Sequence, residues 1–212
     1  MNTKIRWLML LSMTGLMLSG CMSPRSYMDP GFPKMSYEQI NRRNEPLKLK
    51  LTAEFQRNGA HYEKADLTLK DNSERILRGT GVITPSAEPV DGEINIVCNN
   101  VGDLGSAAAK GIGIGLTFGA IGNTVTDGYE LSVSIKTKDG KTINRSEIKH
   151  ALHTAIGNTS VPEGVETVLP NVAFERVLEQ MLLKAIRDMQ ESGELTWLIQ
   201  VIDQKAMMAW SS

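Results

Sequence analysis

The stretch YELSVSIKTKDGKTINRSEIKHALHTA, residues 129–155, contains two segments that are candidates for strands, 129–137 and 142–155. The short polar stretch 138–141 separates them. Apolar and polar side chains alternate over 129–137, and this period of two predicts a strand with one buried face. Asp139-Gly140 follows, and Asp-Gly between two such runs is the strongest short-range signal of a β-hairpin. We therefore expect a second strand over 142–155 that pairs with the first.

A helix is predicted downstream, over 171–191. Apolar residues recur there at intervals of three and four while charged residues occupy the other face, which is the pattern of an amphipathic helix. Ser192-Gly193 is expected to end it. The stretch 194–212 is apolar but aperiodic, so an edge strand and a short helix both remain open for this C-terminal extension. The apolar positions of the helix are Phe174, Val177, Leu178, Met181, Leu182, Ala185, Ile186 and Met189.

Upstream of the hairpin, alternation predicts strands over 47–55 and 93–98. Helical spacing predicts a helix over 65–78, and 85–92 is expected to be a loop. The order of these elements predicts an α+β domain over residues 46–193. Its sheet is expected to be antiparallel or mixed, with about four strands and with two helices packed on one face.

The N-terminus is expected to be an address signal rather than part of the fold. Lys4 and Arg6 precede a short apolar run over 7–18, which is too short to span a bilayer as a helix. A basic start followed by a short apolar core is typical of a secretory signal peptide, here residues 1–20. Leu18-Ser19-Gly20-Cys21 resembles the bacterial lipobox, which implies that the signal is removed and that Cys21 carries acyl chains.

The resemblance to lipoproteins also implies a location. In these proteins an Asp after the lipidated cysteine retains the protein at the inner membrane, whereas position 22 is Met here. We therefore expect sorting to the outer membrane, facing the periplasm. Residues 21–45 are rich in proline and lack hydrophobic periodicity, so they predict a flexible tether with a reach of about 25–30 Å. Tyr27, Phe32 and Tyr37 are nevertheless expected to pack on the domain.

A glycine-rich segment over 105–122 interrupts the domain. Read as a helix, Gly111, Gly115 and Gly119 form a stripe of small residues that would let another helix or a membrane segment approach closely. Read as a strand or loop, the segment packs on itself, because each glycine in a helix costs about 0.5–1 kcal/mol. Membrane insertion is a third interpretation. The candidate contact surface is Gly111, Gly115 and Gly119.

Candidate catalytic and metal-binding residues are few. His150 and His153 are three residues apart, so on a strand they point to opposite faces and cannot share a metal, whereas on a helix they could. Cys98 lies in the apolar phase of its predicted strand and is expected to be a buried small hydrophobe. No nucleophile elbow, phosphate-binding loop or complete dinucleotide fingerprint occurs in the sequence, so we expect no enzyme activity and no cofactor or metal.

Several stretches resemble an uncharacterised family of proteobacterial outer-membrane lipoproteins to which no activity is assigned. The likeness covers residues 45–193 and implies no function beyond the anchor. The stretches that carry it are 53–59, 110–119, 150–157 and 174–183.

Composition narrows the functions further. The 212 residues carry 23 basic and 24 acidic side chains, for a net charge of −1, which gives no bulk basic charge for nucleic acid. Two cysteines cannot form a disulfide scaffold. We therefore expect a non-catalytic lipoprotein that binds an envelope protein. A lipid or small-ligand carrier, or an auxiliary component of transport, is the alternative, and a hydrolase using His150 or His153 is a third.

Overall fold

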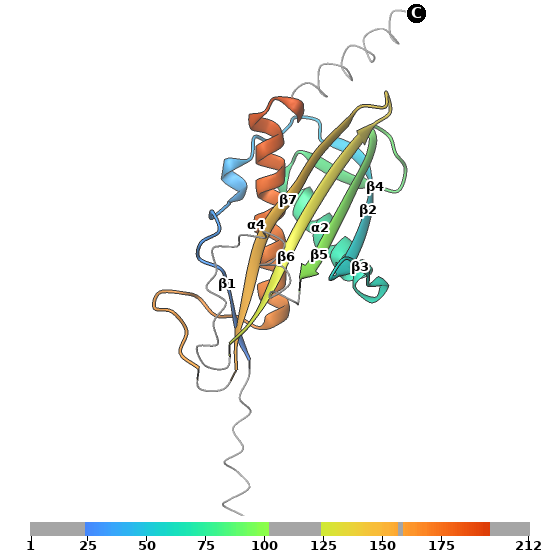
Figure 1. Ribbon diagram of the computed structural model, residues 1–212. Coiled ribbons are helices and arrows are strands. Elements are labelled where there is room, and N and C mark those ends of the chain that lie inside the picture. The colour runs from blue at the N-terminus through green and yellow to red at the C-terminus, as the bar shows by residue number, and fades with distance from the viewer. Residues whose placement is uncertain (1–23, 102–123, 157–158, 196–212) are drawn as a thin grey trace, which may run out of the picture.

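The computed structural model describes residues 24–101, 124–156 and 159–195. Over these residues the protein is an α+β fold in which a mixed seven-stranded sheet carries two α-helices (Figure 1). Two short 3-10 helices are also present: η2 lies before β2, and η3 lies before α2. In chain order the elements are β1 (Arg25–Met28), η2 (Tyr37–Gln39), β2 (Leu47–Arg57), β3 (Ala60–His61), η3 (Glu63–Ala65), α2 (Asp66–Thr80), β4 (Ile83–Ser86), β5 (Gly92–Val101), β6 (Thr124–Thr137), β7 (Thr142–Ala155) and α4 (Pro170–Glu191).

The strand order along the sheet is β1-β7-β6-β5-β2-β3, and β4 pairs with β2 beside this path. The pairs β1–β7, β7–β6, β6–β5 and β2–β3 are antiparallel. Strand β2 runs parallel to both β4 and β5. Helix α2 lies between the parallel strands β2 and β4 in the chain, as parallel pairing requires a crossover connection.

The expected hairpin forms the centre of the sheet, and this prediction is confirmed. Strands β6 and β7 pair from Lys136↔Thr142 to Thr124↔Ala155. The Thr137 N–H donates to the Lys141 carbonyl at 2.9 Å across the turn. Gly140 has a φ of 86°, which a residue with a Cβ adopts only at a cost.

A β-bulge in β7 changes which side chains face the helices. Leu131 pairs with Ile148 but Val133 pairs with Arg145, so two residues of β7 lie opposite one residue of β6. Glu147 has a φ of 59° within this bulge. The extra residue shifts the alternation, so Ile143 and Ile148 are both buried in the core although they are five positions apart.

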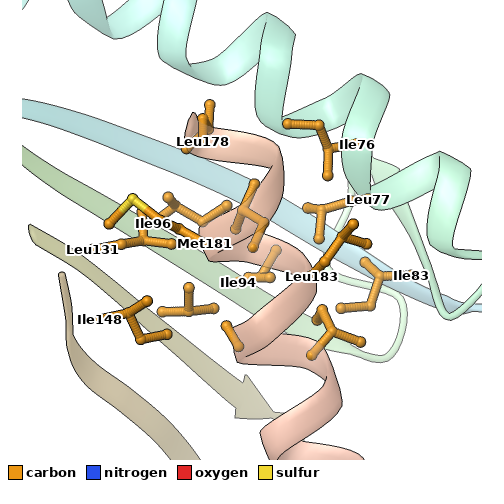
Figure 2. Packing of buried hydrophobic residues seen from close by; sticks show 14 of the residues in the cluster. Ile76, Leu77, Ile83, Ile94, Ile96, Leu131, Ile148, Leu178, Met181 and Leu183 are labelled. Atoms are coloured by element: carbon orange, nitrogen blue, oxygen red, sulfur yellow. The ribbon is translucent and has the colours of Figure 1, made fainter. Parts of the chain in front are cut away.

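Both helices cover the same face of the sheet, as expected. The apolar side chains of the helices pack against those of the strands (Figure 2). The predicted helices over 65–78 and 171–191 are confirmed in α2 and α4. Gly81, with a φ of 67°, ends α2. Within the described residues no helix is long and apolar enough to cross a membrane. The labelled core residues are Ile76, Leu77, Ile83, Ile94, Ile96, Leu131, Ile148, Leu178, Met181 and Leu183.

The expectation of about four strands is wrong, because three short strands escape a period-based prediction. Strands β1, β3 and β4 contain 4, 2 and 4 residues. The expected loop over 85–92 begins inside β4, which pairs with the N-terminal half of β2. Pro85 is tolerated there because β4 lies beside the main strand path, where a missing N–H costs little.

The expectation of a flexible tether is wrong for residues 24–45, the described part of that range. Arg25–Met28 form β1 and pair with β7 at the edge of the sheet. Met35 and Ile40 are 5% and 4% exposed and belong to the core. The Gln180 side chain of α4 binds both backbone groups of Met35, at 2.5 Å to its N–H and 2.9 Å to its carbonyl. We call residues 24–45 the N-terminal arm.

Candidate functional sites

The sequence-predicted site residues fall into two groups. Cys21, Gly111, Gly115 and Gly119 lie outside the described residues, so their lipidation and contact roles stay predictions. His150, His153 and Cys98 lie in the sheet and have defined surroundings. The surroundings of these three residues, and of the aromatic side chains of the N-terminal arm that contact them, are described in turn below.

His150 is buried beneath the N-terminal arm. Its ring is 2% exposed and stacks on Phe32 with centroids 4.1 Å apart and an interplanar angle of 8°. Its Nδ1 atom accepts a hydrogen bond from the Ala151 N–H at 2.8 Å. Burial, and to a smaller extent the nearby His153, lower the pKa of His150 to about 4. The ring is therefore neutral near pH 7 and acts as a packing surface for the arm.

His153 stacks on the first aromatic residue of the arm. The ring centroids of Tyr27 and His153 are 4.9 Å apart, and His153 Nδ1 lies 2.9 Å from the Thr126 hydroxyl. Burial lowers the pKa of His153, and the Asp29 carboxylate opposes this change. Tyr27, His153 and Thr126 are directly paired across three strands, so they form one row on the sheet.

The strand geometry separates the two histidines. His150 pairs with Tyr129, whose ring contacts Phe174 of α4 at 5.3 Å, so it faces the helices. His153 lies three positions further along β7. Because side chains alternate between the faces of a sheet, it faces the opposite side. The prediction that a strand keeps them apart is confirmed. Among the described residues no group of three histidine, cysteine or acidic side chains could hold a metal.

A hydrolytic site would need an activated nucleophile beside one of these rings. The Thr126 hydroxyl forms a hydrogen bond with His153, and this contact uses Nδ1. In a triad a third group orients the base through its other nitrogen. Within the described residues, no hydrogen bond joins a carboxylate to either ring, so the geometry of the described site offers no triad.

Cys98 is buried on the helix-facing side of β5. It is 1% exposed, and burial raises the pKa of its thiol to about 12. A thiol held neutral in this way is a poor nucleophile, since the thiolate is the reactive form. The prediction that Cys98 acts as a small hydrophobe is confirmed.

The aromatic residues of the N-terminal arm pack on the domain, as the sequence predicted. Besides the two ring stacks, the Tyr37 hydroxyl donates to the Glu179 carboxylate of α4 at 2.9 Å. Burial and this carboxylate raise the pKa of Tyr37 to about 12. Sequence reasoning identified the aromatic side chains, but it missed that their partners are the two histidines and α4.

A ligand carrier would need an apolar cavity between the helices and the sheet. Some of the described residues line hollows at the surface. One, of about 270 Å³, lies between the arm and the end of α4 at Gln39, Asn41 and Gln190. Another, of about 430 Å³, is open and lies beside Ile143 and Glu194. Between sheet and helices the described core residues are packed against each other.

Comparison with known proteins adds little to this geometry. No protein-family model matches the chain, and no curated protein matches it. Among solved structures, a variant PelC dodecamer from Paraburkholderia phytofirmans is similar over 76% of this chain and 95% of that chain. The sequence identity is 10% and the TM-score is 0.28, which is too low to carry an argument about fold or function.

Proposed function

We propose that the protein is a lipid-anchored accessory lipoprotein of the bacterial envelope, held at the periplasmic side of the outer membrane through Cys21. The lipobox supports the anchor, and the resemblance to proteobacterial lipoproteins supports the location. The single structural observation that carries the proposal is the docked N-terminal arm. Because β1 begins at Arg25 and pairs with β7, the folded domain starts directly after the candidate lipidation site.

This arrangement limits how far the domain can move from the membrane. Four residue steps separate Cys21 from Arg25, so even a fully extended chain spans only about 14 Å. A flexible stretch of residues 21–45 would instead reach about 25–30 Å. The domain therefore works at the membrane surface, and a partner protein must be embedded in the membrane or come to it.

Lipidation is tested by metabolic labelling with radioactive palmitate. The wild-type protein should incorporate label and fractionate with membranes, because Cys21 supplies the thiol that accepts the acyl chains. The Cys21→Ala variant should remain unlabelled and uncleaved or mislocalised. Palmitate label that persists in the variant would contradict the anchor.

We further propose that the activity is non-catalytic and consists of binding an envelope protein, in keeping with the anchor and the arm. The surface suggested for this contact is the glycine stripe. Gly115→Val should abolish crosslinking to the partner in intact cells, because the branched side chain prevents close approach. Gly113→Ala lies off the stripe and should preserve crosslinking. Equal loss in both variants would contradict a helical contact surface.

A further inference from the structure

Large apolar side chains that are exposed to solvent gather at one end of the domain. Six such residues occur among the described parts of the chain. Three of them lie at the end of the sheet where β1 starts, whereas Val90 lies at the opposite end, beside Gly92, which pairs with Thr137. The three, with their exposed fractions, are Val125 (49%), Ile156 (44%) and Leu169 (57%). We call them the apolar end.

Strand register places all three residues beside the start of β1. Arg25 and Thr124 both pair with Ala155, which brings Val125 and Ile156 to the same sheet terminus as β1. Ser26 pairs with Val168, so Leu169 lies next to this row as well. These three side chains come from separate segments and meet only in the folded protein.

Tyr62 and Leu67 lie beyond the end of β2 and are not part of the apolar end. Arg57 at the end of β2 pairs with Asn100 of β5, and Asn100 pairs with Tyr129 of β6, five positions along β6 from Thr124. Strand β2 also lies four strands away from β1 in the sheet.

We propose that the apolar end rests on the lipid surface, so that the domain has a fixed orientation on the membrane. This inference rests on the proposed anchor at Cys21, because the short connection keeps Arg25 within about 14 Å of the lipids, and Arg25 lies at the sheet terminus that carries the apolar end. Exposed apolar side chains beside it gain by entering the interfacial region of the bilayer. Arg25 is itself exposed and supplies a cation for lipid phosphates.

Val90 offers a matched control, since it is 43% exposed but lies far from the membrane in this orientation. It lies in the loop before β5, where Asp91 accepts a hydrogen bond from Lys138 of the β6–β7 turn. Cysteines introduced at Val125, Leu169 or Val90 can be labelled selectively, because Cys98 is buried and Cys21 would be acylated.

The experiment uses the full lipidated protein in vesicles of phosphatidylethanolamine and phosphatidylglycerol. An environment-sensitive fluorophore is attached to Val125→Cys, Leu169→Cys or Val90→Cys. The first two should show blue-shifted emission on vesicles and at least a twofold quenching by nitroxide-labelled lipids, whereas Val90→Cys should show neither.

Flotation of the vesicles reads out the anchor separately. Protein that floats but shows equal, unquenched emission at all three positions would overturn the lipid-facing orientation and leave the anchor standing. Protein that does not float would overturn the proposed function itself. Blue-shifted emission at Val125 and Leu169 that rises with protein concentration and is insensitive to the lipid quencher would assign the apolar end to contact between copies of the chain, which also overturns the proposal.

Discussion

Replacing His150 by Gln should remove a large part of the loss of stability at mildly acidic pH. The folded protein holds the His150 pKa at about 4, whereas an unfolded chain has the ordinary value near 6.5. Below pH 6.5 the unfolded state therefore binds a proton that the folded state does not bind, so stability falls as the pH falls. The loss levels off only below the folded-state pKa.

The size of the stability loss follows from the difference between the folded and unfolded pKa values of His150. The loss is about 3 kcal/mol when the pH is below both values, and about 2 kcal/mol at pH 5. Urea denaturation at pH 7 and pH 5 measures it, on a chain that begins at residue 22 and carries no lipid. His153 and the remaining titratable groups are present in both proteins, so the wild type should lose about 2 kcal/mol more than His150→Gln. Equal losses would refute the claim that the ring is buried and neutral beneath Phe32.

Three further predictions concern packing and the arm. Leu182→Ala should lower the free energy of unfolding by about 2–5 kcal/mol in urea denaturation, because Leu182 is fully buried; a change under about 1 kcal/mol would show that this face of α4 is not core. Gln180→Leu should leave the backbone of Met35 unpaired at a cost of about 1–3 kcal/mol, and limited proteolysis should then cut the arm before the domain; an unchanged cleavage pattern would contradict the clamp. Gly92→Ala should prevent folding or destabilise the protein severely in thermal denaturation, because a Cβ there would lie 2.3 Å from the Lys136 carbonyl oxygen; wild-type stability would contradict this close approach.

The long elements were predictable because each carries its own periodic signal. Strands β6 and β7 contain 14 residues each and α4 contains 22, so burial of one face repeats often enough to be recognised. The same reasoning correctly assigned Cys98 to the buried face of β5 and separated His150 from His153.

The remaining features depend on contacts between distant parts of the chain. Strands β1, β3 and β4 are too short to show a period, and each exists because a longer strand offers unpaired backbone groups. The N-terminal arm reads as a tether in the sequence because its partners on α4, including Gln180, lie more than a hundred residues away. The bulge at Glu147 reverses the alternation within β7, and a strict period of two cannot reveal it.

The most direct test of the account's central claim is the intact mass of the protein purified from membranes. A protein anchored as proposed should have the mass of residues 21–212 plus the acyl chains carried by Cys21. The Cys21→Ala variant, purified in the same way, should show no added lipid mass. An unmodified mass, or one that retains residues 1–20, would contradict the anchor on which both the proposed function and the membrane orientation depend.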